Sequence, residues 1–291
     1  MCDTYLTVID QEIPTITCPA DTNGTTDPGL PTGNVSFPEA TVSDNSLMLL
    51  PLAVNATSGD PFPIGETVVE FVATDSSGKT NSCTFTITVI DLTDPVIKCP
   101  ADIVTDTDVG QSFATVTWDA PNVTDNSGEM QPAVLSQASG SEFQIGTHTV
   151  TVNATDSHGN TGNCSFTIEV QDNEKPNITC PDNATTPTDG GANSSTITFP
   201  PLVAEFDNSG LPITTSIDAD GVSYSVGNTT VLALSDTPYL LQYTATDSYS
   251  NVEMCDTYLT VIDLMDPVIE CPADIVTDAD VGQSFATVMW Y

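Results

Sequence analysis

The spacing of eight cysteines constrains the fold of this 291-residue chain more than any other feature. The gaps between successive cysteines are 16, 65, 16, 65, 16, 75 and 16 residues, for Cys2, Cys18, Cys83, Cys99, Cys164, Cys180, Cys255 and Cys271. This regularity indicates an internal repeat with a period of 81 residues, which lengthens to 91 in the third unit. The spacing therefore predicts similar small domains in tandem.

Short motifs recur in the same order in each unit, for example ATDSSGK, ATDSHGN and ATDSYSN. The stretch MCDTYLTVID stands at residues 1–10 and again at 254–263, so we expect the chain to be a window cut from a longer array. We predict that residues 1–10 are the C-terminal strand of a preceding module and that residues 264–291 are the N-terminal part of a following one. Between them we predict three modules, at residues 11–91, 92–172 and 173–263, of which the third has a longer middle.

Two regular disulfide pairings compete, because cysteines either 16 or 65 to 75 residues apart can be joined. Residues 83–99 read as a strand, a joint and another strand, whose ends lie about 50 Å apart when extended. A disulfide needs Cα atoms within about 7 Å, so geometry favours the longer spacing. That pairing joins Cys18–Cys83, Cys99–Cys164 and Cys180–Cys255. It leaves Cys2 and Cys271, whose partners are then expected outside this window. Structural disulfides indicate an oxidising, extracellular or secretory location.

The hydrophobic pattern is that of β-strands. Apolar and polar side chains alternate over residues 150–155 and 164–170, and residues 113–118 form a third such segment. Turn-forming residues separate these segments, and no helical periodicity runs longer than a turn. About 80 residues with about seven short strands predict an all-β chain of tandem Ig-like β-sandwich modules.

Four motifs in order, DPVIKCPADIV, ATVTWDAPNVTDNSG, TVTVNATDSHGN and CSFTIEV, resemble the hyalin repeat (HYR) module. The resemblance covers three full units and two partial ones. It implies extracellular Ig-like modules in tandem, with adhesion as a theme, and it does not imply catalysis. Thr257 departs from the pattern, because it stands where Phe85 and Phe166 stand in the other units.

Charge narrows the choice of partners. Forty acidic residues against three lysines give a net charge of −37, which disfavours nucleic acid and anionic membranes and favours calcium. No 18-residue apolar run is present, so we expect no membrane insertion in this segment.

The loops at one end of an Ig-like sandwich gather acidic residues, which predicts calcium sites at the module joints. The candidate ligands are Asp10, Asp44 and Asp75 in module 1, Asp91, Asp94, Asp125 and Asp156 in module 2, and Asp172, Asp207 and Asp247 in module 3. The alternative is that these aspartates only shape turns.

Ten N-x-S/T sequons predict a surface coated with N-linked glycans, against the alternative that a threonine-rich chain produces them by chance. They are Asn23, Asn34, Asn55, Asn122, Asn153, Asn163, Asn177, Asn183, Asn193 and Asn228. The two histidines, His148 and His158, occur in one module only, and no GxSxG or HExxH motif is present. We therefore predict that the chain is not an enzyme.

Two functions fit these features. The first is a structural or adhesive extracellular glycoprotein, whose tandem array forms a fibre or matrix strand with neighbouring copies of itself. The alternative is a cell-surface binding module that recognises a protein or glycan ligand. Its only candidate aromatic patch is in module 3, at Tyr224, Tyr239, Tyr243 and Tyr249, of which Tyr243 is expected to point inward.

Overall fold

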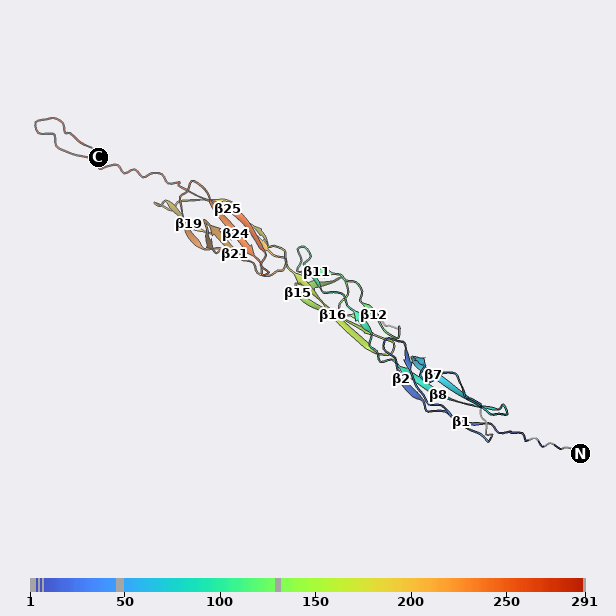
Figure 1. Ribbon diagram of the computed structural model, residues 1–291. Coiled ribbons are helices and arrows are strands. Elements are labelled where there is room, and N and C mark those ends of the chain that lie inside the picture. The colour runs from blue at the N-terminus through green and yellow to red at the C-terminus, as the bar shows by residue number, and fades with distance from the viewer. Residues whose placement is uncertain (1–3, 5, 7, 46–49, 129–131, 290–291) are drawn as a thin grey trace. The chain divides into compact units, whose positions relative to one another are not determined.

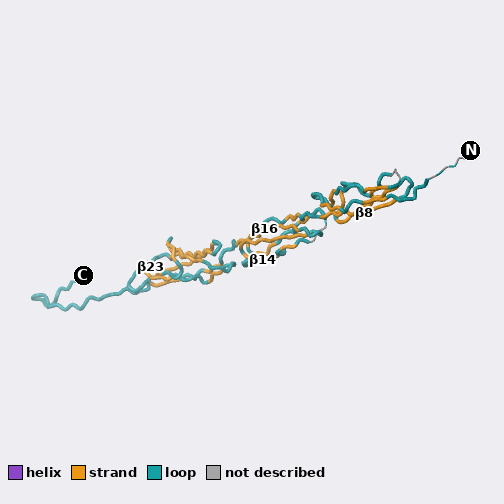
Figure 2. The backbone as a smooth tube through the Cα atoms, turned by 90° about the horizontal axis from the view of Figure 1, so that it is seen from below, coloured by secondary structure: helices purple, strands orange, loops and turns teal. Residues whose placement is uncertain are grey.

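The computed structural model describes residues 4, 6, 8–45, 50–128 and 132–289. These residues form strands and turns, and no helix among them is long and apolar enough to cross a membrane (Figure 2). The chain divides into two compact units, Met1–Asn173 and Glu174–Tyr291. The predicted all-β class is confirmed.

The first half of the first unit, which we call module 1, contains strands β1 to β8 (Figure 1). A four-stranded sheet has the order β2-β8-β7-β5, and the pairs β3-β6 and β1-β4 complete the sandwich. The strands span Thr15–Thr17, Thr22–Thr25, Thr32–Asn34, Thr41–Ser43, Ala53–Val54, Pro61–Pro63, Gly65–Thr74 and Thr80–Ile90.

Module 2, the second half of the first unit, repeats this arrangement with strands β9 to β16. Its sheet has the order β10-β16-β15-β13, and the pairs are β11-β14 and β12-β9. The strands span Val96–Lys98, Ile103–Asp106, Phe113–Val116, Asn122–Thr124, Val134–Leu135, Ser141–Gln144, Gly146–Thr155 and Thr161–Gln171. Within the described residues, both modules thus have eight strands where the sequence predicts about seven, because a two-residue strand carries little pattern.

The second unit holds module 3, with strands β17 to β25. Its main sheet has five strands in the order β18-β25-β24-β21-β22, accompanied by the pairs β19-β23 and β17-β20. The strands span Asn177–Thr179, Ala184–Pro187, Ser194–Thr198, Ala204–Phe206, Thr214–Ala219, Val222–Tyr224, Thr229–Ala233, Tyr239–Thr246 and Val252–Ile262.

The longer middle of module 3 builds a hairpin between β21 and β22. Asp220 and Gly221 connect the strands with φ angles of 56° and 79°. Two consecutive positive φ values are typical of the two-residue turn that matches strand twist, and Asp-Gly is a favoured sequence for it. The added residues therefore extend the sheet by one strand.

The core of each module lies between its two layers, on the inward faces of the long strands. In β16 the inward residues Phe166, Ile168 and Val170 are at most 2% exposed, whereas their polar neighbours face outward. The predicted alternation is confirmed. Tyr243 of β24 is also fully buried and donates a hydrogen bond of 2.9 Å to the carbonyl of Pro200.

In each module a disulfide joins the residue directly after the first strand to the last strand, as the longer cysteine spacing predicts. The bonds are Cys18–Cys83, Cys99–Cys164 and Cys180–Cys255, with Cα atoms 5.7, 6.1 and 5.9 Å apart. The alternative 16-residue pairing is therefore wrong. Cys271 is exposed without a disulfide, and Cys2 lies outside the described residues.

Candidate metal centre

One aspartate in each module shapes the turn between the last two long strands. The Oδ1 atom of Asp156 accepts hydrogen bonds of 2.8 Å from the backbone amides of His158 and Asn160. Asp75 and Asp247 make the same pair of bonds in their own modules. These three aspartates thus have the turn-building role that the sequence offers as an alternative to metal binding.

Asp91, at the entry to module 2, is 2% exposed and ties several segments together. Its Oδ1 atom accepts hydrogen bonds from the amide of Thr93 at 3.1 Å, from Nδ2 of Asn126 at 3.1 Å and from Oγ1 of Thr26 at 3.2 Å. Its backbone carbonyl accepts a bond of 3.2 Å from Nδ2 of Asn160. The Oδ2 atom is buried and accepts no hydrogen bond. Burial of a carboxylate oxygen without a hydrogen bond lowers the stability of the folded protein, and a bound cation would offset this loss.

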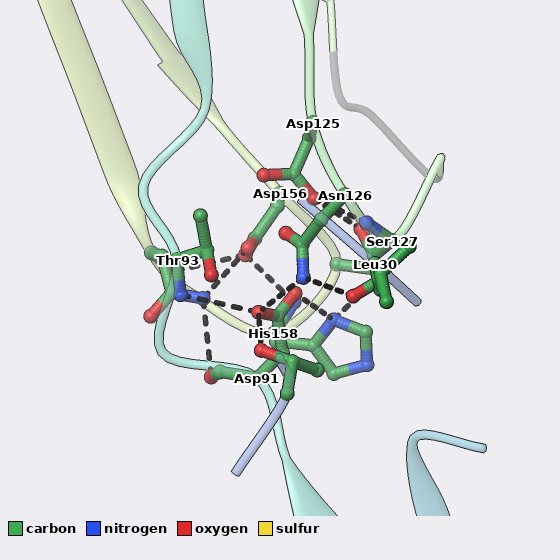
Figure 3. A network of polar contacts seen from close by, with 11 residues as sticks. Leu30, Asp91, Thr93, Asp125, Asn126, Ser127, Asp156 and His158 are labelled. Atoms are coloured by element: carbon green, nitrogen blue, oxygen red, sulfur yellow. Dashed lines mark hydrogen bonds and ion pairs between the residues drawn. The ribbon is translucent and has the colours of Figure 1, made fainter. Parts of the chain in front are cut away.

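Asp91 and Asp156 approach each other together with His158 (Figure 3). One ligand atom from each of the three side chains lies within 4.8 Å of the others. The distance from Nδ1 of His158 to Oδ2 of Asp91 is 3.6 Å. Sequence reasoning missed His158 as a member of this group, although its position two residues after Asp156 in ATDSHGN was a usable signal.

Asp125 and Asp94, the other two candidates of module 2, stand outside that group of three. Oδ2 of Asp125 accepts hydrogen bonds from the backbone and side chain of Ser127, while its Oδ1 atom is buried without one. Oδ1 of Asn126 is likewise buried without a hydrogen bond. Asp94 is exposed and lines an open depression beside Asp125 and Asn126.

Module 1 contains a similar group built only from carboxylates, in which Asp10, Asp44 and Asp75 offer ligand atoms within 4.8 Å of one another. Oδ2 of Asp10 and Oδ2 of Asp75 are buried without a hydrogen bond, and Asp75 is fully buried. Nδ2 of Asn45 donates to Oδ1 of Asp10 at 3.2 Å. Nζ of Lys79 donates to the backbone carbonyl of Asp10, which brings a positive charge to this cluster.

The third predicted set is divided between the two units. Asp172 belongs to the first unit and is buried, while Asp207 and Asp247 belong to the second. Oδ2 of Asp207 accepts from Ser209, much as Asp125 accepts from Ser127. Metal binding by these three residues stays a prediction.

The charge state of Asp156 suits a cation. Burial acts to raise the pKa of this carboxyl, but hydrogen bonds from Asn160 and from the amides of His158 and Gly159 outweigh it. The pKa of Asp156 therefore lies below its ordinary value, and the side chain is ionised at neutral pH. Carboxylate and amide oxygens fit a hard cation such as calcium, so the residues present in modules 1 and 2 fit the ion.

All ten sequon asparagines are exposed. Two of them also hold the sheets together. Asn183 accepts a hydrogen bond of 2.9 Å from the amide of Tyr258, and Asn55 accepts one of 3.0 Å from the amide of Glu70. Both bonds are accepted by the side-chain Oδ1 atom. Attachment of a glycan at any of the ten asparagines stays a prediction.

Comparisons with known proteins agree with the repeat pattern. A model of the HYR domain matches residues 9–89 and 90–170. Hyalin of Strongylocentrotus purpuratus is 31% identical over 264 residues, which cover 88% of this chain and 21% of that protein. Hyalin of Lytechinus variegatus is 28% identical over 293 residues, which cover 97% of this chain and 53% of that protein.

A third relative is the sushi, von Willebrand factor type A, EGF and pentraxin domain-containing protein 1 of Rattus norvegicus. It is 36% identical over 167 residues, which cover 56% of this chain and 5% of that protein. This chain thus spans less than two thirds of each of these relatives. Because the two domain matches together cover more than half of its residues, the chain belongs to the HYR domain family.

Proposed function

We propose that this chain is a stretch of an extracellular adhesive or matrix protein. In this proposal its tandem modules are structural, not catalytic, and associate with neighbouring copies of themselves. Disulfides stabilise each module, calcium stiffens the module entrances, and N-linked glycans cover the surface. The similarity to two hyalins and the repeat architecture support this assignment.

The observation that carries the proposal is the polar connection between modules 1 and 2. Asn126 of module 2 bonds both to the carbonyl of Leu30 in module 1 and to the carboxylate of Asp91 between them. The buried Oδ2 atom of Asp91, which accepts no hydrogen bond, lies beside this connection. A bound cation there would link the entry segment to a loop of module 2 and hold the joint.

Module 1 offers a second place for calcium, at Asp10, Asp44 and Asp75. Lys79 adds a positive charge beside this cluster, whereas Asn160 occupies the equivalent position in module 2. Because like charges repel, we expect Lys79 to weaken calcium binding by module 1. Replacement of Lys79 by Asn is therefore expected to raise the calcium affinity of that cluster.

An open pocket in module 3 favours the alternative function, a cell-surface binding module for a protein or glycan. Thr257 replaces the core phenylalanine of modules 1 and 2, and the pocket forms beside it. Its lining combines apolar side chains with threonines, including Ile197, Leu241 and Leu259 together with Thr186, Thr196 and Thr198. Such a mixed lining suits a small amphipathic group.

Bead aggregation separates the two functions. The glycosylated chain, secreted from eukaryotic cells, is coated on beads that are mixed in millimolar calcium or in a chelator. The structural proposal predicts that the beads aggregate through self-association, and that the chelator reverses this. Beads that stay dispersed in calcium, yet bind to cells or to a glycan array, would replace the structural proposal with the binding one.

A further inference from the structure

The metal-binding candidates of modules 1 and 2 share two equivalent aspartates and differ in the third donor, which is Asp44 in module 1 and His158 in module 2. The 81-residue repeat aligns His158 of module 2 with Ser77 of module 1. We propose that Asp91, Asp156 and His158 form a site for a borderline transition metal, zinc, whereas the all-carboxylate cluster of module 1 takes calcium. This inference rests on the proposed role of divalent cations at the module entrances.

Asp91 supplies the observation that points to a ligand. Its side chain is fully buried, and its Oδ2 atom accepts no hydrogen bond although it lies 3.6 Å from Nδ1 of His158. That separation is too long for a hydrogen bond. Two ligands that each lie about 2.0–2.2 Å from one zinc ion at a near-tetrahedral angle are themselves about 3.5 Å apart. The observed spacing therefore suits two donors that share one metal ion.

Asp156 completes a set of three protein donors. Its Oδ2 atom accepts a bond of 2.7 Å from Nδ2 of Asn160, and its Oδ1 atom accepts the two turn amides. These hydrogen bonds fix the orientation of the carboxylate, as hydrogen bonds to metal-binding carboxylates commonly do. They also leave lone pairs on its oxygens that can bind a metal ion. Two carboxylates and one imidazole match the nitrogen and oxygen donors of zinc sites, with room for water as a further ligand.

His158 provides both the selectivity and the route of entry. Nδ1 also lies 3.2 Å from Oγ of Ser157, a hydroxyl that rotates readily and is replaceable as a partner. The imidazole side chain is 33% exposed, so the cluster opens to solvent on that side. Imidazole nitrogen favours zinc, nickel and copper, whereas carboxylates and water alone favour calcium and magnesium. One histidine thus changes the class of metal that the cluster prefers.

Calorimetric titration of the whole chain with zinc tests this site. Cys2 and Cys271 are replaced by serine, so that no cysteine beyond those of the three disulfides can contribute to zinc binding. We compare the parent chain with His158→Ser and with His148→Ser, where His148 lies on β15 and its Nε2 atom contacts the carbonyl of Gln144. Zinc affinity is expected to fall at least about 10-fold in His158→Ser and to stay unchanged in His148→Ser.

Two further measurements sharpen the test. Proton–nitrogen NMR of the histidine rings should show that zinc shifts the signals of His158 and not those of His148. Ser77→His should add zinc binding to module 1, because it places the same nitrogen donor beside the carboxylates there. Failure of Ser77→His to bind zinc would count against the histidine as the determinant.

The inference is overturned if zinc binds His158→Ser as tightly as the parent chain, or if the parent chain binds no zinc. A separate calcium titration of His158→Ser distinguishes this from failure of the proposed function. Calcium binding retained in that variant, without zinc binding by the parent, would remove only the zinc inference. Loss of response to both ions in the parent would remove the cation role altogether.

Discussion

Asn126 of module 2 donates a hydrogen bond of 3.1 Å from Nδ2 to the backbone carbonyl of Leu30 in module 1. The same nitrogen donates to Oδ1 of Asp91, also at 3.1 Å. One amide therefore connects a loop of module 1, the segment between the modules and a loop of module 2.

Asn126→Ala should loosen this connection. The substitution removes a bond to a buried carboxylate, a loss of about 1–3 kcal/mol. Hydrogen exchange at the amide of Thr93, which donates to the same carboxylate, should accelerate. Asn45→Ala is the matched control, because Asn45 makes the equivalent bond to Asp10 in module 1. Equal exchange rates in the parent and in Asn126→Ala would show that Asn126 does not hold the joint.

Removal of the module 2 disulfide should destabilise that module strongly. Replacing Cys99 and Cys164 by serine opens a loop of 65 residues, which costs about 4 kcal/mol by the chain-entropy relation. Trp118 reports on this module alone in a Trp290→Phe background, since its ring packs 5.3 Å from that of Phe166. Its fluorescence during denaturant unfolding should show a much lower midpoint, while Cys271→Ser leaves the midpoint unchanged. An unchanged midpoint in the double variant would contradict the structural role of the bond.

Acid should weaken module 2 through Asp102. Its carboxylate accepts a hydrogen bond of 2.6 Å from the amide of Thr167, and this bond lowers its pKa from the ordinary 3.8. A carboxyl whose pKa is lower in the folded state contributes stability above pH 3.8, and this contribution is lost as pH falls through the folded pKa. In Asp102→Asn the side-chain oxygen can still accept this hydrogen bond, as Asn183 accepts the equivalent bond in module 3. The asparagine side chain does not titrate.

The parent should therefore be more stable than Asp102→Asn at pH 6, and this difference should shrink below about pH 3.8. Unfolding of module 2 followed through Trp118 at a series of pH values measures it. A difference that stays constant down to pH 3 would mean that the carboxylate does not act through its charge.

Gly162 permits a close approach between β16 and the entry to module 2. A Cβ atom at this position would stand 2.0 Å from the carbonyl oxygen of Pro95. Gly162→Ala should therefore force a backbone shift and destabilise module 2 by about 1–3 kcal/mol. Ser165→Ala on the exposed face of the same strand is the control, with an expected change below about 0.5 kcal/mol. Equal unfolding midpoints for the two variants would contradict the close approach.

The sequence was sufficient to predict the long core strands and the three disulfides. The side-chain period of two is a local property, so residues such as Phe166 and Ile168 reveal which face of β16 is buried. The cysteine frame restricts distant pairings, because a strand between Cys83 and Cys99 excludes a bond between them. Tyr243 was assigned to the core by the same register, and it is fully buried.

The metal cluster was only partly predictable. The repeat frame and the loop positions of an Ig-like sandwich were enough to suggest Asp91 and Asp156 as neighbours. The contribution of His158 depends on how the turn after Asp156 directs the imidazole toward Asp91, which is a tertiary relationship between distant residues. The β21–β22 hairpin was also missed, because the nine-residue insertion had no counterpart in the other units to set its register.

Thermal unfolding of the whole glycosylated chain, in millimolar calcium and in a chelator, tests the central claim most directly. An ion that binds only the folded modules stabilises them by about 2.7 kcal/mol when its concentration is 100 times the dissociation constant. We predict that calcium raises the melting temperature by several degrees, and that Asp75→Asn in the carboxylate cluster of module 1 reduces this increase. Superimposable melting curves in calcium and in chelator would contradict the claim, and would leave the aspartates with only their turn-building role.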